Sequence, residues 1–149
     1  MLRGLRIVVS GIVLAGFTLA GPSLASAQEA AKPAPVMALE GDAAVITILI
    51  KPDQTAAFEG VLAKYQEALA KNDNAARKTQ LAGMKFFKSP TLAQGSAMYM
   101  VVVDPVIKGE EYDITRVVTE VFPVEVKEIY EKYKAAYAGR QIIVLNKVP

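Results

Sequence analysis

The sequence predicts an α+β fold in which a four-stranded antiparallel sheet carries two helices on one face. Two observations support this prediction. Short β-branched segments alternate with longer segments whose apolar residues recur at helical spacing. Their order along the chain is strand, helix, strand, strand, helix, strand. The roughly 120 residues after the N-terminal leader suit one domain with a core of its own.

The first strand is predicted at 43–51, where the sequence AAVITILIK is short, β-branched and almost entirely apolar. Pro52 and Asp53 follow it with turn and helix-start chemistry. The helix after them carries an apolar stripe formed by Phe58, Val61, Leu62, Tyr65 and Leu69. We expect this helix to end at the polar run 72–74.

The second and third strands are predicted as a hairpin. A weaker strand is expected over 77–88, with a bulge or a close backbone approach at Gly83. A loop over 89–95 contains proline and glycine. The strand over 97–103 reads AMYMVVV and is the clearest strand in the chain.

The second helical segment is predicted in two parts. Asp113 can cap a helix that begins at the next residue. Pro123 interrupts that helix because proline has no N–H to donate. The second part is expected to run to about Ala138, before Gly139, and the last strand covers 140–148. The resulting β-α-β-β-α-β order is the split βαβ, or ferredoxin-like, arrangement.

Residues 1–27 predict a secretory signal peptide. Arg3 and Arg6 precede a short apolar run. The segment Ala25-Ser26-Ala27 then provides the small residues that signal peptidase recognises. The run is shorter than the roughly 20 apolar residues of a spanning helix, so we expect export to the periplasm or the medium, without a stable membrane anchor. The Ala- and Pro-rich segment 28–41 is predicted as a tether, and 42–149 as the folded domain.

Missing residue types restrict the possible chemistry. The chain has no cysteine, histidine or tryptophan, which excludes disulfides, thiolate metal sites and histidine-based triads. Without Arg3 and Arg6, 15 basic residues balance 15 acidic residues, so nothing electrostatic favours nucleic acid or anionic lipid. No glycine-rich phosphate loop is present. We therefore expect no cofactor.

Three acidic residues gather on one predicted loop: Glu110, Glu111 and Asp113. Carboxylate oxygens are the ligands that calcium prefers, but this spacing matches no EF-hand loop. We expect a solvated loop that ends in a helix cap, and no metal site.

Both faces of the predicted sheet are apolar. Alternate residues of a strand point to opposite faces, and both sets are apolar in the strands over 43–51, 97–103 and 140–148. Two helices cover one face, and soluble monomers rarely expose an apolar patch as large as the other. We expect a homodimer with the two sheets face to face. Shielding by the tether or the C-terminus is the alternative.

This element order, with a long amphipathic first helix and a two-sided apolar sheet, covers residues 43–148 and resembles the dimeric α+β barrel superfamily. Antibiotic-biosynthesis-monooxygenase-like domains belong to that superfamily. The resemblance implies paired sheets and, as an alternative function, a cofactor-independent monooxygenase-like enzyme with its substrate in the barrel. Members often use a histidine, or an aromatic and polar set with asparagine and tryptophan, and this chain has neither histidine nor tryptophan. No catalytic residue can be assigned.

A tentative ligand pocket consists of five aromatic residues: Tyr99, Tyr65, Phe58, Phe122 and Tyr130. Apolar pockets with a few polar groups are the usual small-molecule sites, but the same residues would also serve as core filling. Tyr130 belongs to a helical stripe with Tyr133 and Tyr137, which either walls a cavity or packs a helix on the sheet. The sequence favours an exported, dimeric, non-catalytic module that binds a small apolar ligand or a protein partner.

Overall fold

The computed structural model describes residues 33–149, which form one compact unit that begins at Pro33. The predicted signal peptide and residues 28–32 of the predicted tether lie outside this part of the chain. Within it, no helix combines the length and the apolar character that crossing a membrane requires.

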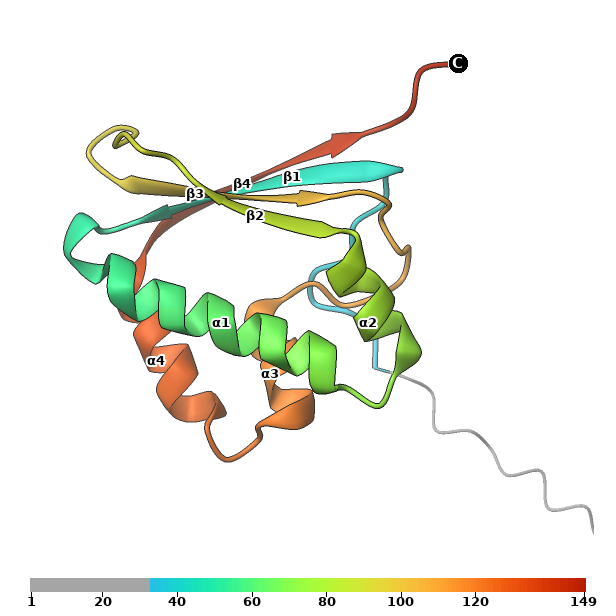
Figure 1. The fold of residues 1–149 in the computed structure, drawn as a ribbon, viewed down its shortest axis with the longest axis horizontal. Coiled ribbons are helices and arrows are strands. Elements are labelled where there is room, and N and C mark those ends of the chain that lie inside the picture. The colour runs from blue at the N-terminus through green and yellow to red at the C-terminus, as the bar shows by residue number, and fades with distance from the viewer. Residues whose placement is uncertain (1–32) are drawn as a thin grey trace, which may run out of the picture. The chain divides into compact units, whose positions relative to one another are not determined.

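A four-stranded antiparallel sheet runs through the domain (Figure 1). Its strands are β1 (Ala43–Ile50), β2 (Met84–Lys88), β3 (Ala97–Val103) and β4 (Tyr137–Leu145). Their spatial order is β2-β3-β1-β4, which together with the chain order defines the ferredoxin-like arrangement. The predicted α+β class, strand number and antiparallel pairing are therefore confirmed.

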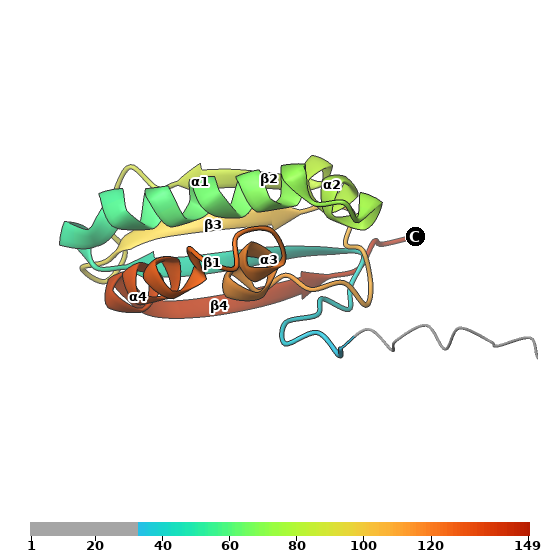
Figure 2. The same cartoon turned by 90° about the horizontal axis from the view of Figure 1, so that it is seen from below.

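The helices lie on one face of this sheet (Figure 1). A short 3-10 turn at Pro52–Gln54 leads into α1 (Thr55–Lys71). The chain returns through α3 (Ile114–Val121) and α4 (Val126–Ala136). Figure 2 shows α1 on the β2–β3 side, with α3 and α4 over β1 and β4. The apolar stripe predicted for the first helix is buried on α1, so this helix covers the sheet as expected.

The break between α3 and α4 falls at Pro123, as the sequence predicts. Asp113 caps α3: its Oδ1 accepts the backbone N–H of Arg116 at 3.1 Å. The Asp113 cap marks where α3 begins, and the break at Pro123 divides the second helical segment into two shorter helices.

The predicted strand over 77–88 is wrong in its first half. Residues Ala75–Ala82 form a further helix, α2, so the sheet face carries more than the two predicted helices. Asn74 starts α2, because its side-chain oxygen accepts the Ala76 N–H at 2.9 Å. Gly83 ends α2 and forms no bulge. It does make a close backbone approach, since a Cβ there would lie 3.2 Å from the Asp104 carbonyl oxygen.

The helix-to-strand boundary near the C-terminus also differs from the prediction. α4 ends at Ala136 and β4 begins at Tyr137, so Gly139 lies inside the strand and the strand covers 137–145 instead of 140–148. The Lys51 N–H donates to the Ala136 carbonyl at 2.9 Å, and Tyr137 pairs with Ile50. Pairing with β1 therefore takes over where local sequence alone would continue the helix.

The last part of the predicted tether is packed on the domain. Met37 and Leu39 are buried. The Glu111 carboxylate accepts the backbone N–H groups of Val36 at 2.6 Å and Met37 at 2.9 Å. The folded unit therefore extends N-terminally of residue 42, because these two apolar side chains join the core.

Candidate functional site

The layer between the sheet and the helices is almost completely filled. Residues such as Ile48, Tyr65 and Val101 line a remaining cavity of about 20 Å³. A cavity of this size holds about one water molecule. A small apolar ligand has no room here in the structure as it stands.

Three of the five predicted pocket residues are core residues. Phe58 and Tyr99 are buried, and their ring centroids lie 4.8 Å apart in an edge-to-face contact. Tyr65 is also buried, and its hydroxyl donates to the Tyr112 carbonyl at 3.3 Å. Of these three, only Tyr65 borders the small inner cavity. Their placement matches the core-filling alternative.

The other two predicted pocket residues lie elsewhere. Phe122 ends α3 and packs beneath Lys64, whose Nζ is 4.4 Å from the ring centroid. Tyr130 is on α4 and 43% exposed. The five residues therefore do not line one common pocket.

Tyr99 reaches the surface with its hydroxyl, beside a hollow of about 220 Å³. The hydroxyl donates to Glu59 Oε1 at 2.8 Å, and the same oxygen accepts from Lys88 Nζ at 2.7 Å. Burial raises the pKa of Tyr99, and the hydrogen bond to Glu59 raises it further. At neutral pH this phenol is a proton-carrying donor, which is the wrong form for a general base.

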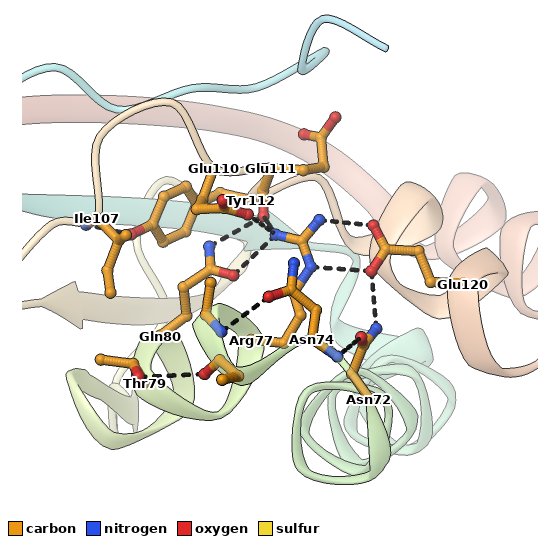
Figure 3. A network of polar contacts seen from close by, with 12 residues as sticks. Asn72, Asn74, Arg77, Thr79, Gln80, Ile107, Glu110, Glu111, Tyr112 and Glu120 are labelled. Atoms are coloured by element: carbon orange, nitrogen blue, oxygen red, sulfur yellow. Dashed lines mark hydrogen bonds and ion pairs between the residues drawn. The ribbon is translucent and has the colours of Figure 1, made fainter. Parts of the chain in front are cut away.

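A buried arginine organises the end of the domain near α2 (Figure 3). Arg77 is 1% exposed. It holds Glu120 in a two-point ion pair of 2.6 and 2.9 Å and Glu110 at 3.0 Å. Gln80 and the Glu111 carbonyl accept from it at 2.8 and 3.0 Å. No buried side-chain nitrogen or oxygen of residues 33–149 lacks a partner, so this cluster is structurally complete.

The acidic loop is less solvated than the sequence predicts, because Glu111 is buried beneath the N-terminal segment. Burial opposes its charge, but backbone N–H groups of Asp113, Val36 and Met37 outweigh that effect and lower the pKa of Glu111. Among residues 33–149, no group of three or more acidic side chains is arranged to hold a metal ion.

Sequence reasoning missed the role of Arg77, because it placed this residue in a strand. The Asn-capped helix start at residue 74 was the available signal.

The sheet face turned away from the helices is a distinctive surface of the described domain. Strand register places one set of residues on it: Val45, Thr47, Leu49, Lys85, Phe87, Met98, Met100, Val102, Gln141, Ile143 and Leu145. We call this set the outer sheet face. Nearly all of it is apolar, and Phe87, Ile143 and Leu145 are each 45–50% exposed.

Neither described end of the chain shields the outer sheet face. Figure 1 shows the C-terminal residues leading away from the sheet, and Val148 is 91% exposed. The N-terminal segment is held at Glu111, and Met37 borders the cavity on the helix side. Within residues 33–149, self-shielding is therefore not observed.

Comparisons with known proteins add no function. No protein-family model matches the chain, and no curated protein matches it. Among solved structures, it is similar to a dimeric ferredoxin-like protein of unknown function from Thermobifida fusca. That match has 18% identity and a TM-score of 0.35, and it covers 75% of this chain and 96% of the other. The strand order and helix placement define this chain as a ferredoxin-like α+β domain.

Proposed function

We propose that the protein is exported and acts as a homodimeric, non-catalytic binding module whose two copies pair through the outer sheet face. The observation that carries this proposal is a sheet that is apolar on both sides but covered on only one. Soluble monomers rarely leave such a patch in water. A second copy offers a surface of the same kind, as two-fold pairing requires.

The outer sheet face approaches the size that a specific interface needs. Its strands contain 8, 5, 7 and 9 residues and lie about 4.8 Å apart, so the face projects an area of roughly 450 Å². Two such faces together bury about 900 Å², and the relief of the side chains adds to this projected area, which brings the pair near the about 1,000 Å² of a specific interface. The only charged residue on the face is Lys85, on the edge strand β2, where it would stay at the rim of the pair.

A non-catalytic role is supported by the protonation of the buried tyrosines. Burial raises the pKa of Tyr65 and, to about 12, that of Tyr133, and Tyr99 is shifted in the same direction. With no histidine in the chain, these phenols donate hydrogen bonds at neutral pH and do not accept protons. They suit ligand binding better than proton abstraction.

The alternative is a cofactor-independent monooxygenase-like enzyme. It would place its substrate in the hollow beside Tyr99, where Glu59 and Lys88 also lie. Oxygen uptake with a quinol substrate that disappears in Tyr99→Phe would support this alternative. If oxygen uptake is absent, or is unchanged in Tyr99→Phe, the enzyme alternative is rejected and the non-catalytic binding module stands.

Native mass spectrometry of the purified mature chain tests the proposal. Expression of the full chain in a bacterial host with an export pathway is expected to yield an exported product that begins at Gln28. Its native mass is expected to be twice that of one chain. Retention of residues 1–27, or a single-chain mass at tens of micromolar, would contradict export or pairing respectively.

A further inference from the structure

A second surface hollow lies between α4 and the edge strand β4, on the helix side of the sheet. It has a volume of about 230 Å³ and is lined by Tyr130, Tyr133, Lys134, Tyr137 and Arg140. We call it the tyrosine–arginine groove. Since β4 is an edge strand, the groove opens at a free margin of the sheet. It is on the opposite side from the outer sheet face, so pairing through that face would not cover it.

Two of the three groove tyrosines pack against other aromatic rings. Tyr133 stacks on the buried Phe58 with ring centroids 5.9 Å apart. Tyr137 meets Tyr133 edge to face at 5.7 Å. Tyr130 and Tyr137 are 43% and 39% exposed, so ring surface remains for another molecule. Planar ligands pack well on such surfaces.

The polar part of the groove is cationic and unpaired. Among residues 33–149, the side chains of Lys134 and Arg140 form no ion pair and no hydrogen bond, and no acidic residue lines the groove. Lys134 only approaches the Tyr130 ring, at 5.9 Å. Arg77, in contrast, donates to Glu120, Glu110, Gln80 and the Glu111 carbonyl. An unpaired guanidinium can bind a carboxylate through two parallel hydrogen bonds.

A neutral phenol also borders the groove. Tyr133 borders both the groove and the small inner cavity, and so does Arg140. The Tyr133 hydroxyl forms no hydrogen bond with residues 33–149. Burial, with Arg140 acting in the opposite direction, raises the pKa of Tyr133 to about 12. The hydroxyl is therefore a donor at physiological pH.

We propose that the tyrosine–arginine groove binds a small aromatic carboxylate. The ring would lie against Tyr130 and Tyr137, and the carboxylate would accept from Arg140 and the Tyr133 hydroxyl. A volume of about 230 Å³ is below the roughly 300–1,000 Å³ of drug-sized sites, which suits a ligand with one ring. This assignment rests on the proposed binding role and gives it a ligand class, an anion instead of the apolar molecule that the sequence favours.

Titration of the mature protein with benzoate, followed by NMR, tests the assignment. We expect saturable shifts at the groove residues. Benzyl alcohol keeps the ring but loses a charge-assisted contact, which is worth about a factor of ten. Acetate keeps the charge but loses the packing of the ring on Tyr130 and Tyr137. Both probes are therefore expected to bind at least about tenfold more weakly than benzoate. Equal binding of either probe would overturn the requirement for both a ring and a charge.

Substitutions in the groove test which residues contact the ligand. Arg140→Gln is expected to weaken the binding of benzoate about tenfold while leaving the binding of benzyl alcohol unchanged. Tyr133→Phe is expected to weaken the binding of benzoate severalfold. Arg116→Gln, at an exposed arginine of α3 outside the groove, is the matched control and should change nothing. Benzoate binding weaker than about 10 mM, or binding that Arg140→Gln leaves intact, would overturn the proposal.

The same samples separate this proposal from the dimer. A chain that has the dimer mass but does not bind benzoate overturns the groove assignment alone. A monomeric chain that binds benzoate at the groove overturns the paired sheets alone.

Discussion

The two faces of the sheet are built from similar residues but differ in what covers them. Along β1, Ala44, Ile46, Ile48 and Ile50 point to the helices and are at most 4% exposed. Val45, Thr47 and Leu49 alternate with them on the outer sheet face and are only partly buried. The inner face is completed by the chain's own helices. The outer face has the apolar composition of an inner one, and this is the basis of the proposed pairing with a second copy.

The largest expected effect comes from two neighbouring residues of β3 that point to opposite faces. Val101 is 4% exposed and pairs with Ile46 and Phe86. In Val101→Asp, an unpaired carboxylate enters the core at a cost of several kcal/mol, much of the about 5–15 kcal/mol that stabilises a domain. We expect no cooperative unfolding transition by circular dichroism.

Met100→Asp is the matched control for Val101→Asp. Its side chain lies on the outer sheet face between Thr47 and Phe87, so the isolated domain should still fold. A folded Val101→Asp protein, or an unfolded Met100→Asp protein, would show that the two faces are assigned the wrong way round.

The second largest effect is expected at the buried arginine. Arg77→Ala removes the two-point ion pair that holds the Glu120 carboxylate and the ion pair to Glu110. Breaking a buried pair typically costs about 3–5 kcal/mol, and the partial exposure of Glu120 places our expectation near the lower value. Urea denaturation measures the loss. Arg116→Ala, at an exposed arginine, should stay within about 0.5 kcal/mol of the wild type. A loss below about 1 kcal/mol for Arg77→Ala would contradict the role given to this cluster.

A smaller effect is expected at Glu111, which holds the N-terminal segment. Its pKa is lower in the folded chain than its ordinary value of 4.5, so its contribution to stability is present above that value and is lost as pH falls through the folded pKa. Glu111→Gln should cost about 1–3 kcal/mol at pH 7, because backbone N–H groups lose an acceptor. The difference in unfolding free energy from the wild type should shrink in acid. A difference independent of pH would refute the assignment.

The smallest effect is expected at Tyr133 in alkali. Its pKa is raised to about 12, so its stabilising contribution is full below the ordinary tyrosine value of about 10 and is lost as pH rises through 12. Tyr133→Phe should reduce the loss of stability in this window, as measured by thermal unfolding. A Tyr133 that titrates near 10 in an ultraviolet absorbance titration would show that the ring is not buried.

The same contrast between faces explains how far the sequence could be interpreted. The strands β1 and β3 were predictable because their sequences are short, β-branched and almost entirely apolar. The stripe on α1 was predictable because its apolar residues recur at helical spacing. The helix α2 was missed because it is short and mostly polar, and its start depends on the single cap at Asn74. The end of α4 was misplaced because pairing between Tyr137 and Ile50 is a long-range contact.

The candidate site was less predictable than the fold. Aromatic residues at 58, 65 and 99 carry the same sequence signal whether they fill a core or line a pocket. Of the groove residues, the tyrosine stripe was visible as a helical pattern, but Arg140 joins it only because β4 turns back beside α4. No local pattern encodes that juxtaposition.

Sedimentation equilibrium of the mature chain and of Met100→Asp, both at tens of micromolar, tests the central claim most directly. We predict the mass of two chains for the wild type and of one folded chain for the variant. A monomeric wild type, or a variant that remains dimeric, would contradict pairing through the outer sheet face.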